Sequence, residues 1–491
     1  MLTLALILFP VVVASGLLLV KGDTVKTLAL GAALIELALA GYAFATFAPT
    51  AASQFGFDYP WISSLGIRFS AGIDGISILL VILTGFLVPL IVLSAFRQTY
   101  ERPATFYALI LFMQAALMGV FTARDGFLFY LFFEAALIPI YFLAAGWGGE
   151  DRIPVTFKFF LYTIFGSLFM LLGLVYLYYQ TPLVGGHHTS AIVDFYKLNM
   201  TPDAQGLVFW AFFIAFAIKM PVFPFHTWQP DTYVESPTPA TMLLAGIMLK
   251  MGVYGVIRFI LPIVPTGVVN WGTMAMILSV IGIVYGSLIA IRQRDMKRLI
   301  AYSSFAHVGL MAAGAFSLTA TGLQGALVQM LAHGINVVGM FFVAQVIFER
   351  TNTRLLDQLG GITRTTPKLT VYFMIMLLGS VALPLTNGFV GEFLLLQGVF
   401  SFNYTLGAIA GLTIILGAVY MLRMYQKSMF GQTTARTENF ADLTGSESWV
   451  FLPLAIMVFW IGIYPHSFLK LTEPAVANLL QYISKGAVSL K

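Results

Sequence analysis

Cysteine is absent from this sequence of 491 residues, and charged side chains are scarce, at 10% of the total. Without cysteine the chain forms no disulfide, offers no thiolate nucleophile and holds no cysteine-ligated zinc ion or iron–sulfur cluster. No G-x-x-x-x-G-K-[ST] segment occurs either, so the phosphate-binding loop of nucleotide-driven pumps is missing. Ordinary globular domains carry about 25% charged residues. The shortage of charge therefore excludes a soluble globular protein.

Hydrophobic residues make up 59% of the chain, and the apolar runs recur from end to end. The formal charge of +5 is small for this length, and the basic residues flank the apolar runs. This distribution is typical of membrane topology and does not suggest binding to nucleic acid. The composition predicts an integral membrane protein whose surface contacts lipid.

A bilayer core about 30 Å thick requires roughly 20 apolar residues per helix. By this criterion we expect an all-α polytopic protein with fourteen membrane-spanning helices. They cover residues 2–20, 27–47, 73–96, 104–123, 126–147, 155–179, 206–226, 239–262, 271–291, 297–317, 322–348, 369–400, 404–427 and 449–466. The segment from Glu473 to Lys491 is weakly amphipathic and is expected at the membrane interface.

Lysine and arginine are distributed unevenly between the loops on the two sides of the predicted membrane. Sixteen lie on one side and seven on the other. Under the positive-inside rule the side with sixteen faces the cytoplasm, which places both termini outside. Lys219, Lys250 and Arg423 remain, and they fall within predicted spans.

Ionisable residues inside the spans are the candidates for function, because a charge at the bilayer centre costs at least about 2.5–3.5 kcal/mol. Each of them needs a partner, a wet cavity or a functional role. They are Glu36, Glu134, Lys219, Lys250, His307, His333, Glu392 and Arg423.

Three pairs of these residues repeat at one spacing. A separation of 173 residues joins Glu134 to His307, Lys219 to Glu392, and Lys250 to Arg423. The offset aligns five helices within 104–262 with five within 271–430, and because five is odd, equivalent helices cross in opposite directions. We therefore expect two inverted-topology repeats, as in secondary transporters. Three helices in 1–103 precede them, and the last helix and tail in 431–491 follow.

Proline interrupts two helices that this offset brings into correspondence. Two prolines follow Lys219 in the helix at 206–226, and Pro384 precedes Glu392 in the helix at 369–400. Proline removes a backbone donor and clashes with the preceding turn, so both helices are expected to be broken. Broken backbone within a membrane persists only where it is buried in protein or faces water. This favours a hydrated ion site in each half over ordinary proline kinks.

Helical spacing sorts further polar residues into two stripes. One stripe contains Gln329, His333 and Asn336, and the other contains Ser303, Ser304 and His307. A single buried histidine is more often a packing residue, but two on consecutive helices favour a proton relay. Arg423 either belongs to the same path or extends to the membrane surface, and the role of Glu36 is left open.

Two groups of loop residues are candidates for further sites. A proton entrance and ordinary loop polarity both fit His226, Asp231 and Glu235. A solvated loop is expected at His187, His188 and Asp194, because three candidate ligands without a supporting pattern do not indicate a metal site.

A buried lysine beside a carboxylate suits proton transfer. Burial destabilises the charged amine and a nearby carboxylate stabilises it, so a Glu134–Lys219 pair would hold a proton when closed and release it when separated. Lys250 and the two histidines would accept the proton in turn, because histidine titrates near neutral pH. Glu392 would be the last site before the outer face. Moving each proton against 100 mV costs about 2.3 kcal/mol, and we expect partner subunits to supply that energy.

Five segments around these residues resemble a known family when read in order. They are Phe212–Pro221, His226–Asp231, Leu244–Lys250, Lys297–Ser304 and Gly388–Phe393. The sequence resembles the antiporter-like subunits of respiratory complex I (NADH–quinone oxidoreductase), the M-type in particular. Glu392 supports that type, because the L-type, N-type and sodium/proton antiporter subunits typically have lysine at this position.

The resemblance implies fourteen helices with two inverted five-helix repeats in a bacterial inner membrane, and proton translocation coupled to NADH–quinone electron transfer elsewhere in the complex. It assigns proton-transfer roles to Glu134, Lys219, Lys250, His307, His333 and Glu392. It implies no cofactor on this chain, with flavin, iron–sulfur clusters and quinone on partner subunits, and contacts with L-type and N-type subunits. The alternative is a subunit of a multi-subunit cation/proton antiporter or of a membrane-bound hydrogenase.

One segment departs from the family pattern. Family members often read Leu-Pro-Asp-Ala-His where this chain has Gln229 to Tyr233. Tyr233 therefore replaces a histidine, which calls a titratable entrance residue at this position into question.

Overall fold

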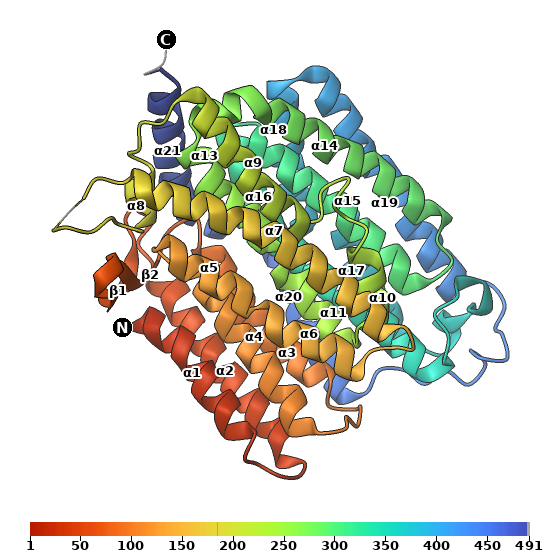
Figure 1. Ribbon diagram of the computed structural model, residues 1–491. Helices are drawn as coiled ribbons and strands as arrows, with labels where there is room; N and C mark the ends of the chain where they lie inside the picture. The colour runs from red at the N-terminus through yellow and green to blue at the C-terminus, as the bar shows by residue number, and fades with distance from the viewer. Residues whose placement is uncertain (184, 489–491) are drawn as a thin grey trace.

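The computed structural model describes residues 1–183 and 185–488 as a bundle of helices with one small β-hairpin (Figure 1). Residue 184 and residues 489–491, including Lys491 of the predicted interfacial segment, lie outside the described part of the chain. The N-terminal elements are α1 (Leu2–Leu17), α2 (Thr24–Thr46), β1 (Gln54–Ile62), η1 (Ser63–Leu65), β2 (Ile67–Ile73), α3 (Ile78–Ser94), α4 (Pro103–Thr122), α5 (Gly126–Ala135), α6 (Leu137–Trp147), α7 (Arg152–Gln180) and α8 (Ile192–Phe195). They continue with α9 (Pro202–Lys219), α10 (Gln229–Glu235), α11 (Thr238–Leu243), η2 (Leu244–Met248), α12 (Lys250–Gly255), η3 (Val256–Ile260), α13 (Leu261–Ile263), α14 (Pro265–Arg292), α15 (Met296–Phe316) and α16 (Ala320–Thr351). The C-terminal elements are η4 (Leu356–Gln358), η5 (Ile362–Arg364), α17 (Pro367–Ser380), α18 (Asn387–Phe402), α19 (Tyr404–Met429), α20 (Gly445–Ile463) and α21 (His466–Val488).

Eleven helical segments among the described residues are long and apolar enough to cross a membrane. The helices α1, α3 and α17 are also apolar but have at most 17 residues. Each of the fourteen predicted ranges coincides with one helix or with consecutive helices. The polytopic helical membrane fold is therefore confirmed, whereas the number of crossings stays a prediction.

Both expected helix interruptions are present. The helix α9 ends at Lys219, and regular helix resumes only at Gln229 in α10. In the same way α17 ends at Ser380 and α18 begins at Asn387. Local hydrogen bonds satisfy part of the backbone that each interruption releases. The Trp228 indole donates to the Ile218 carbonyl oxygen at 2.9 Å, for example.

A second kind of irregularity, which the sequence did not predict, surrounds Lys250. The segments η2 and η3 are π-helical, and they flank the short α-helix α12 that begins at Lys250. Apart from the partly exposed Thr238 and Arg258, the stretch from Thr238 to Ile263 is buried inside the protein. Single π-helical turns inside α-helices frequently mark functional sites, because they shift backbone groups out of the regular hydrogen-bond ladder.

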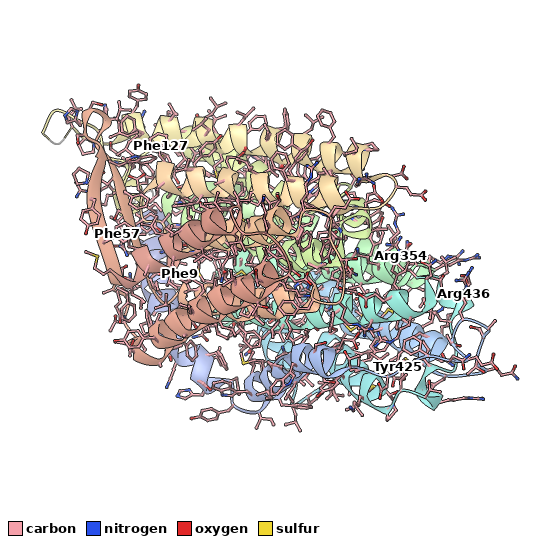
Figure 2. All side chains as sticks on the ribbon, turned by 90° about the horizontal axis from the view of Figure 1, so that it is seen from below. Phe9, Phe57, Phe127, Arg354, Tyr425 and Arg436 are labelled. Carbon is pink, nitrogen blue, oxygen red and sulfur yellow. The ribbon has the colours of Figure 1, made fainter. Side chains whose placement is uncertain are left out.

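The two ends of the bundle differ in character. At one end, β1 and β2 form an antiparallel hairpin that contacts the N-terminus, where Thr3 donates to the Phe55 carbonyl oxygen at 2.8 Å. Figure 2 shows Phe57 of this hairpin at the end opposite to Arg354 and Arg436. The hairpin was not predicted, because a search for apolar runs of membrane length does not detect short strands.

The helices α15 and α16 form the centre of the bundle and are almost completely buried. They pack side by side, and α16 also packs against α17, α18 and α21. Glycine permits close approach at such contacts. A Cβ atom on Gly309 of α15 would lie 2.8 Å from the Ser279 carbonyl oxygen of α14. The predicted polar stripes on α15 and α16 therefore face protein on every side.

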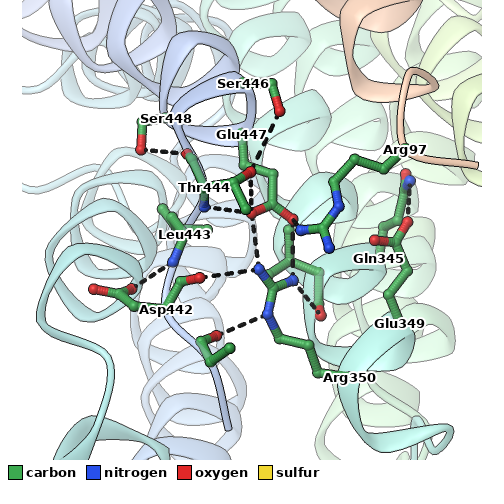
Figure 3. A network of polar contacts seen from close by, with 12 residues as sticks. Arg97, Gln345, Glu349, Arg350, Asp442, Leu443, Thr444, Ser446, Glu447 and Ser448 are labelled. Atoms are coloured by element: carbon green, nitrogen blue, oxygen red, sulfur yellow. Dashed lines mark hydrogen bonds and ion pairs between the residues drawn. The ribbon is translucent and has the colours of Figure 1, made fainter.

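A network of ion pairs ties α3, α16 and α20 together at the end of the bundle that carries Arg354 (Figure 3). Glu447 on α20 is buried and pairs with Arg350 of α16 and with Arg97 beyond α3, each at 2.8 Å. The same carboxylate accepts a hydrogen bond from the Thr444 backbone N–H at 2.7 Å and closes a capping box at the start of α20. The network fixes the C-terminal end of α16.

We predict that Glu447→Ala destabilises the protein by about 3–5 kcal/mol, because it leaves the Arg350 guanidinium in a largely buried position without its carboxylate. Thermal unfolding of the purified protein in detergent measures the effect as a lowered midpoint. The control is Glu438→Ala, since Glu438 lies exposed near the same end of the bundle. Equal midpoints for the two variants would contradict a stabilising role for the network.

Candidate functional site

Lys250 of α12 contacts His333 of α16 in the interior of the bundle. The Lys250 Nζ atom lies 2.9 Å from Nδ1 of His333 and donates to the Ala245 carbonyl oxygen at 2.7 Å. Both side chains are buried. Because Ala245 belongs to η2, the π-helical segment supplies the carbonyl group that anchors the amine. The local irregularity of the helix thus directs Lys250 toward α16.

His307 of α15 and Glu392 of α18 form a second contact. The Nδ1 atom of His307 lies 2.9 Å from Oε1 of Glu392, an ion-pair distance without the angle of a hydrogen bond. Close packing of α18 on α16 supports this arrangement, since a Cβ atom on Gly391 would lie only 2.1 Å from the Gln329 side-chain oxygen. The ring centres of His307 and His333 are 5.8 Å apart.

These contacts join four of the six predicted site residues into one line. Its order is Lys250, His333, His307 and Glu392, and each residue comes from a different helix. Proton transfer requires donor and acceptor within hydrogen-bond reach, directly or through one water molecule. The contacts from Lys250 to His333 and from His307 to Glu392 are each 2.9 Å long, whereas the two histidine rings, with centres 5.8 Å apart, would need a bridging water molecule.

A cavity of about 20 Å³, here called the inner cavity, lies beside the two histidines. Its lining includes Ser303, Ser304 and His307 of α15 and Gln329, His333 and Asn336 of α16. Gly379 and Ser380, where α17 ends, complete one wall. A cavity of this size holds one water molecule when polar groups surround it. The structure thus brings both polar stripes and the second helix interruption to one place.

Glu134 and Lys219 are close but not paired. Among the described residues neither the Lys219 amine nor the Glu134 Oε1 atom has a hydrogen-bond partner. The Lys219 Nζ atom instead lies 4.6 Å from the ring centre of Phe133, the neighbour of Glu134. Lys219 is the last residue of α9, where the partial negative charge of the helix C-terminus favours a cation. The predicted pair is therefore open in this structure.

The candidate entrance residues are not brought together. Asp231 pairs with Arg298 and with Lys158, the latter at 3.3 Å. Lys158 also donates to the Thr227 carbonyl oxygen at 2.9 Å. His226 is buried and stacks on Phe305 with ring centres 4.5 Å apart. His226 and Asp231 thus make contacts within the protein. Glu235, the third candidate entrance residue, lines a separate and larger cavity, whose described lining contains neither His226 nor Asp231.

The other candidate residues lie away from the line. Arg423 is exposed and donates to the Ile291 carbonyl oxygen at 2.8 Å. Glu36 is buried in α2, and its carboxylate has no hydrogen-bond partner among the described residues. His188 contacts the Thr181 carbonyl oxygen at 2.6 Å, and Asp194 pairs with Lys197 at 2.7 Å.

The structure also contains a buried ion pair that sequence reasoning missed. Arg258, which was not among the candidate residues, lies in η3 and pairs with Asp74 at 2.7 Å. Asp74 is buried, and the oxygen that faces Arg258 also accepts hydrogen bonds from the backbone N–H groups of Ile76 and Ser77, at 3.0 and 3.1 Å. The Arg258 guanidinium also donates to the Tyr254 hydroxyl at 3.1 Å. No sequence signal links residues so far apart.

The fold and the buried line define a class: a polytopic membrane protein with connected ionisable side chains in its interior, the arrangement found along ion pathways in membranes. Comparison with known proteins identifies the family. Residues 123–417 match the family described as NADH:quinone oxidoreductase/Mrp antiporter, transmembrane. The chain belongs to this family.

Curated relatives support the same assignment over most of the chain. NADH-quinone oxidoreductase subunit M of Rickettsia typhi is 41% identical over 87% of this chain and 86% of its own length. NADH-ubiquinone oxidoreductase chain 4 of Marchantia polymorpha is 38% identical over 88% and 87%. The resemblance to the antiporter-like subunits of complex I, M-type in particular, is confirmed.

Solved structures share the fold. A chain of respiratory complex I from Thermus thermophilus superimposes with a TM-score of 0.90 and 32% identity, covering 98% of this chain and all of that one. A chain of the Mrp complex from a Dietzia species superimposes with a TM-score of 0.84 at 20% identity, over 98% of each chain, and shows the fold alone.

The second helix interruption allows a test of the packing around the inner cavity. A Cβ atom on Gly388 would lie 2.1 Å from the Gly379 backbone oxygen, which cannot rotate away. We predict that Gly388→Ala costs about 1–3 kcal/mol through overpacking and lowers the thermal midpoint. Gly411→Ala is the control, because nothing described lies within 4 Å of its Cβ position. A midpoint unchanged in both variants would refute the close contact.

Proposed function

We propose that this chain is a proton-translocating subunit of the membrane arm of an NADH:quinone oxidoreductase. The observation that carries the proposal is the line from Lys250 through His333 and His307 to Glu392. The printed names of the relatives, NADH-quinone oxidoreductase subunit M and NADH-ubiquinone oxidoreductase chain 4, support the complex in which it acts. An antiporter or hydrogenase subunit has less support, since the Mrp complex is similar in fold only.

The chemistry of the line suits stepwise proton transfer. Lys250 carries its proton facing Nδ1 of His333, and an imidazole that accepts at one nitrogen releases from the other. The inner cavity provides room for a water molecule between the two rings. His307 then faces the Glu392 carboxylate, which receives the proton beside the second helix interruption.

Glu134 and Lys219 act as the switch ahead of this line. The Lys219 amine lies against the ring of Phe133, the residue before Glu134, and makes no direct contact with the carboxylate. Closing the pair holds the proton on Lys219, and opening it releases the proton toward Lys250. Transfer from Lys219 to Lys250 is supported by the close packing of α12 on the end of α9. A Cβ atom on Gly252 of α12 would lie 2.5 Å from the Cβ atom of Met220, the residue after Lys219.

Two inverted five-helix repeats provide two related channels in this proposal. Helices within 104–262 form the first proton channel, and those within 271–430 form an inverted second channel. Three helices precede the two channels, and one follows them. The helix interruption after Lys219 and the one before Glu392 support the correspondence. We place the end that carries Arg354 and Arg436 in the cytoplasm of a bacterium, with both termini outside the inner membrane.

Partner subunits supply the energy in this proposal. Flavin, iron–sulfur clusters and quinone are held by other subunits, and electron transfer there drives the Glu134–Lys219 switch. L-type and N-type antiporter-like subunits are the expected neighbours in the membrane arm. This chain's own part is to hold and pass protons.

We predict that Lys250→Ala and Glu392→Ala each lower proton pumping about tenfold or more, since each removes a group that must accept and release the proton. Lys219→Ala and Glu134→Ala are expected to impair pumping and the coupled NADH–quinone turnover while the complex still assembles. Inverted membrane vesicles energised with NADH report pumping through a pH-sensitive dye, and sodium-free buffer identifies the ion as H⁺.

Arg423→Ala is the matched control. Arg423 also lies within a predicted membrane span, but its side chain is exposed and away from the line. It should pump at the wild-type rate. Wild-type pumping in both Lys250→Ala and Glu392→Ala would overturn the proposed function.

A further inference from the structure

A second small cavity lies at the end of the bundle that carries the β-hairpin. This hairpin-side cavity has a volume of about 20 Å³, which gives room for one water molecule. Asp74 and Arg258 line it together with Arg124 and Tyr196. Asp74 directly follows β2, and the Arg124 backbone N–H donates to the Ser70 carbonyl oxygen of that strand at 2.9 Å. The cavity therefore lies at the face that the proposed function places outside the membrane.

One continuous helical stretch leads from the proton line to this cavity. Lys250 begins α12, Tyr254 follows four residues later in the same helix, and Arg258 follows after another four residues in η3. Residues four apart in an α-helix share one face. Eight helical residues span about 12 Å. Arg258 therefore stands between Lys250 and the outer face, about two helical turns from the buried amine.

The hydroxyl of Tyr254 lies between the two basic residues. It donates to the Phe121 carbonyl oxygen at 3.1 Å and accepts a hydrogen bond from Nε of Arg258 at 3.1 Å. Phe121 belongs to the last turn of α4, where carbonyl groups lack a partner within the helix. A backbone carbonyl only accepts hydrogen bonds and has no proton to pass on. The Tyr254 ring also packs against Phe121 and Phe129, with ring centres 5.5 and 6.3 Å apart, which fills the space beside it.

Arg258 is equally unsuited to pass a proton, because a guanidinium group in a protein does not lose its charge. Its side chain pairs with Asp74 at 2.7 Å, and the two side chains are only 15% and 12% exposed. The Arg258 carbonyl oxygen accepts a hydrogen bond from the Tyr196 hydroxyl at 2.8 Å. These contacts fix a permanent positive charge between Lys250 and the hairpin-side cavity.

Hydrogen bonding distinguishes this cluster from the proton line. The side chains of Tyr254, Arg258 and Asp74 all have partners. In the line, by contrast, the Nε2 atoms of His333 and His307 have none among the described residues. Polar groups without a protein partner can bind water molecules. A fully satisfied polar network is rigid instead. The structure therefore favours proton movement from Lys250 toward α16 over movement toward the hairpin.

We propose that Arg258, Tyr254 and Asp74 form a proton seal, which prevents a proton on Lys250 from exchanging directly with the outer face. The inference rests on the proposed function, in which Lys250 carries a proton, and adds the reason why that proton moves toward α16. The positive charge of Arg258 repels a passing proton, as arginine does in other membrane pores. Asp74 holds the guanidinium in place. A direct connection from Lys250 to the outside would bypass the rest of the line and let pumped protons flow back.

Arg258→Ser combined with Asp74→Asn tests the seal, because it removes both charges together and leaves no buried ion unpaired. The smaller side chain at position 258 leaves space for water, and the amide at position 74 still accepts from the backbone N–H groups. The purified complex is reconstituted into liposomes with potassium and a potassium ionophore. An enclosed pH-sensitive dye then follows the decay of an imposed pH gradient. We expect decay about tenfold faster than with the wild-type complex.

The matched control is Arg68→Ser combined with Asp58→Asn. Arg68 and Asp58 form the same type of ion pair at 2.6 Å in the hairpin, but both side chains are exposed. This control should show the wild-type decay rate. Arg258→Lys should do so as well, since it keeps a positive charge beside Asp74. Equal decay in the Arg258→Ser/Asp74→Asn complex and in the Arg68→Ser/Asp58→Asn control would overturn the seal.

Lys250→Met identifies the path of the leak, because methionine occupies similar space but carries no proton. Added to Arg258→Ser/Asp74→Asn, it should return the decay to the wild-type rate, since protons can then no longer pass between the opened seal and the rest of the line. A leak that persists in this triple variant does not pass through Lys250, whether it reflects another route or a loosened fold, and would also overturn the proposal.

The two proposals fail in different ways. If the Arg258→Ser/Asp74→Asn complex holds the gradient while Lys250→Ala and Glu392→Ala lose pumping, the seal is wrong and the proposed function stands. If Lys250→Ala and Glu392→Ala pump normally, the proposed function itself is wrong.

Discussion

The cost of keeping charge away from water governs the organisation of this protein. A buried ion needs a counter-ion or several hydrogen bonds to be stable. At one end of the bundle Glu447 is held by two arginines, and near the other end Asp74 is held by Arg258. Both clusters have permanent opposite charges and fix helices in place. In the middle, the partners of Lys250 among the described residues are a carbonyl oxygen and an imidazole. Neutral or titratable partners stabilise a proton on Lys250 but also allow it to leave. The cost of burying charge therefore produces fixed ion pairs at the ends of the bundle and a centre in which a proton can move.

Irregular backbone makes this centre possible. Most carbonyl groups of a regular α-helix already accept a hydrogen bond from within the helix, whereas an irregular segment leaves carbonyl groups available to side chains. The π-helical segment before Lys250 presents the Ala245 carbonyl oxygen, and the end of α17 presents Gly379 and Ser380 to the inner cavity. Close glycine contacts such as Gly391 on Gln329 then bring Glu392 within reach of His307. Interruption of helices and tight packing between them thus act together.

Much of the site was predictable because charge is rare in this sequence. Each ionisable residue in an apolar run had to be explained, and Lys250, His333, His307 and Glu392 were identified on that ground. Helical periodicity also placed the polar stripes of α15 and α16 on the correct faces. Periodicity describes one helix at a time, however, and cannot show which helices are neighbours. The open Glu134–Lys219 pair and the Asp74–Arg258 pair therefore could not be inferred from the sequence.

The sequence by itself determined that this is a helical membrane protein, where its helices are interrupted and which residues carry charge inside it. These properties depend on local composition, because hydropathy, proline and charge act over one helix or less. Tertiary structure alone decided that four ionisable residues on four helices form one line and that a small polar cavity lies beside the two histidines. Such contacts depend on helix packing angles and glycine-mediated approach, which arise only when distant segments assemble. The π-helical turns beside Lys250 belong with them, since packing of the surrounding helices holds them in place.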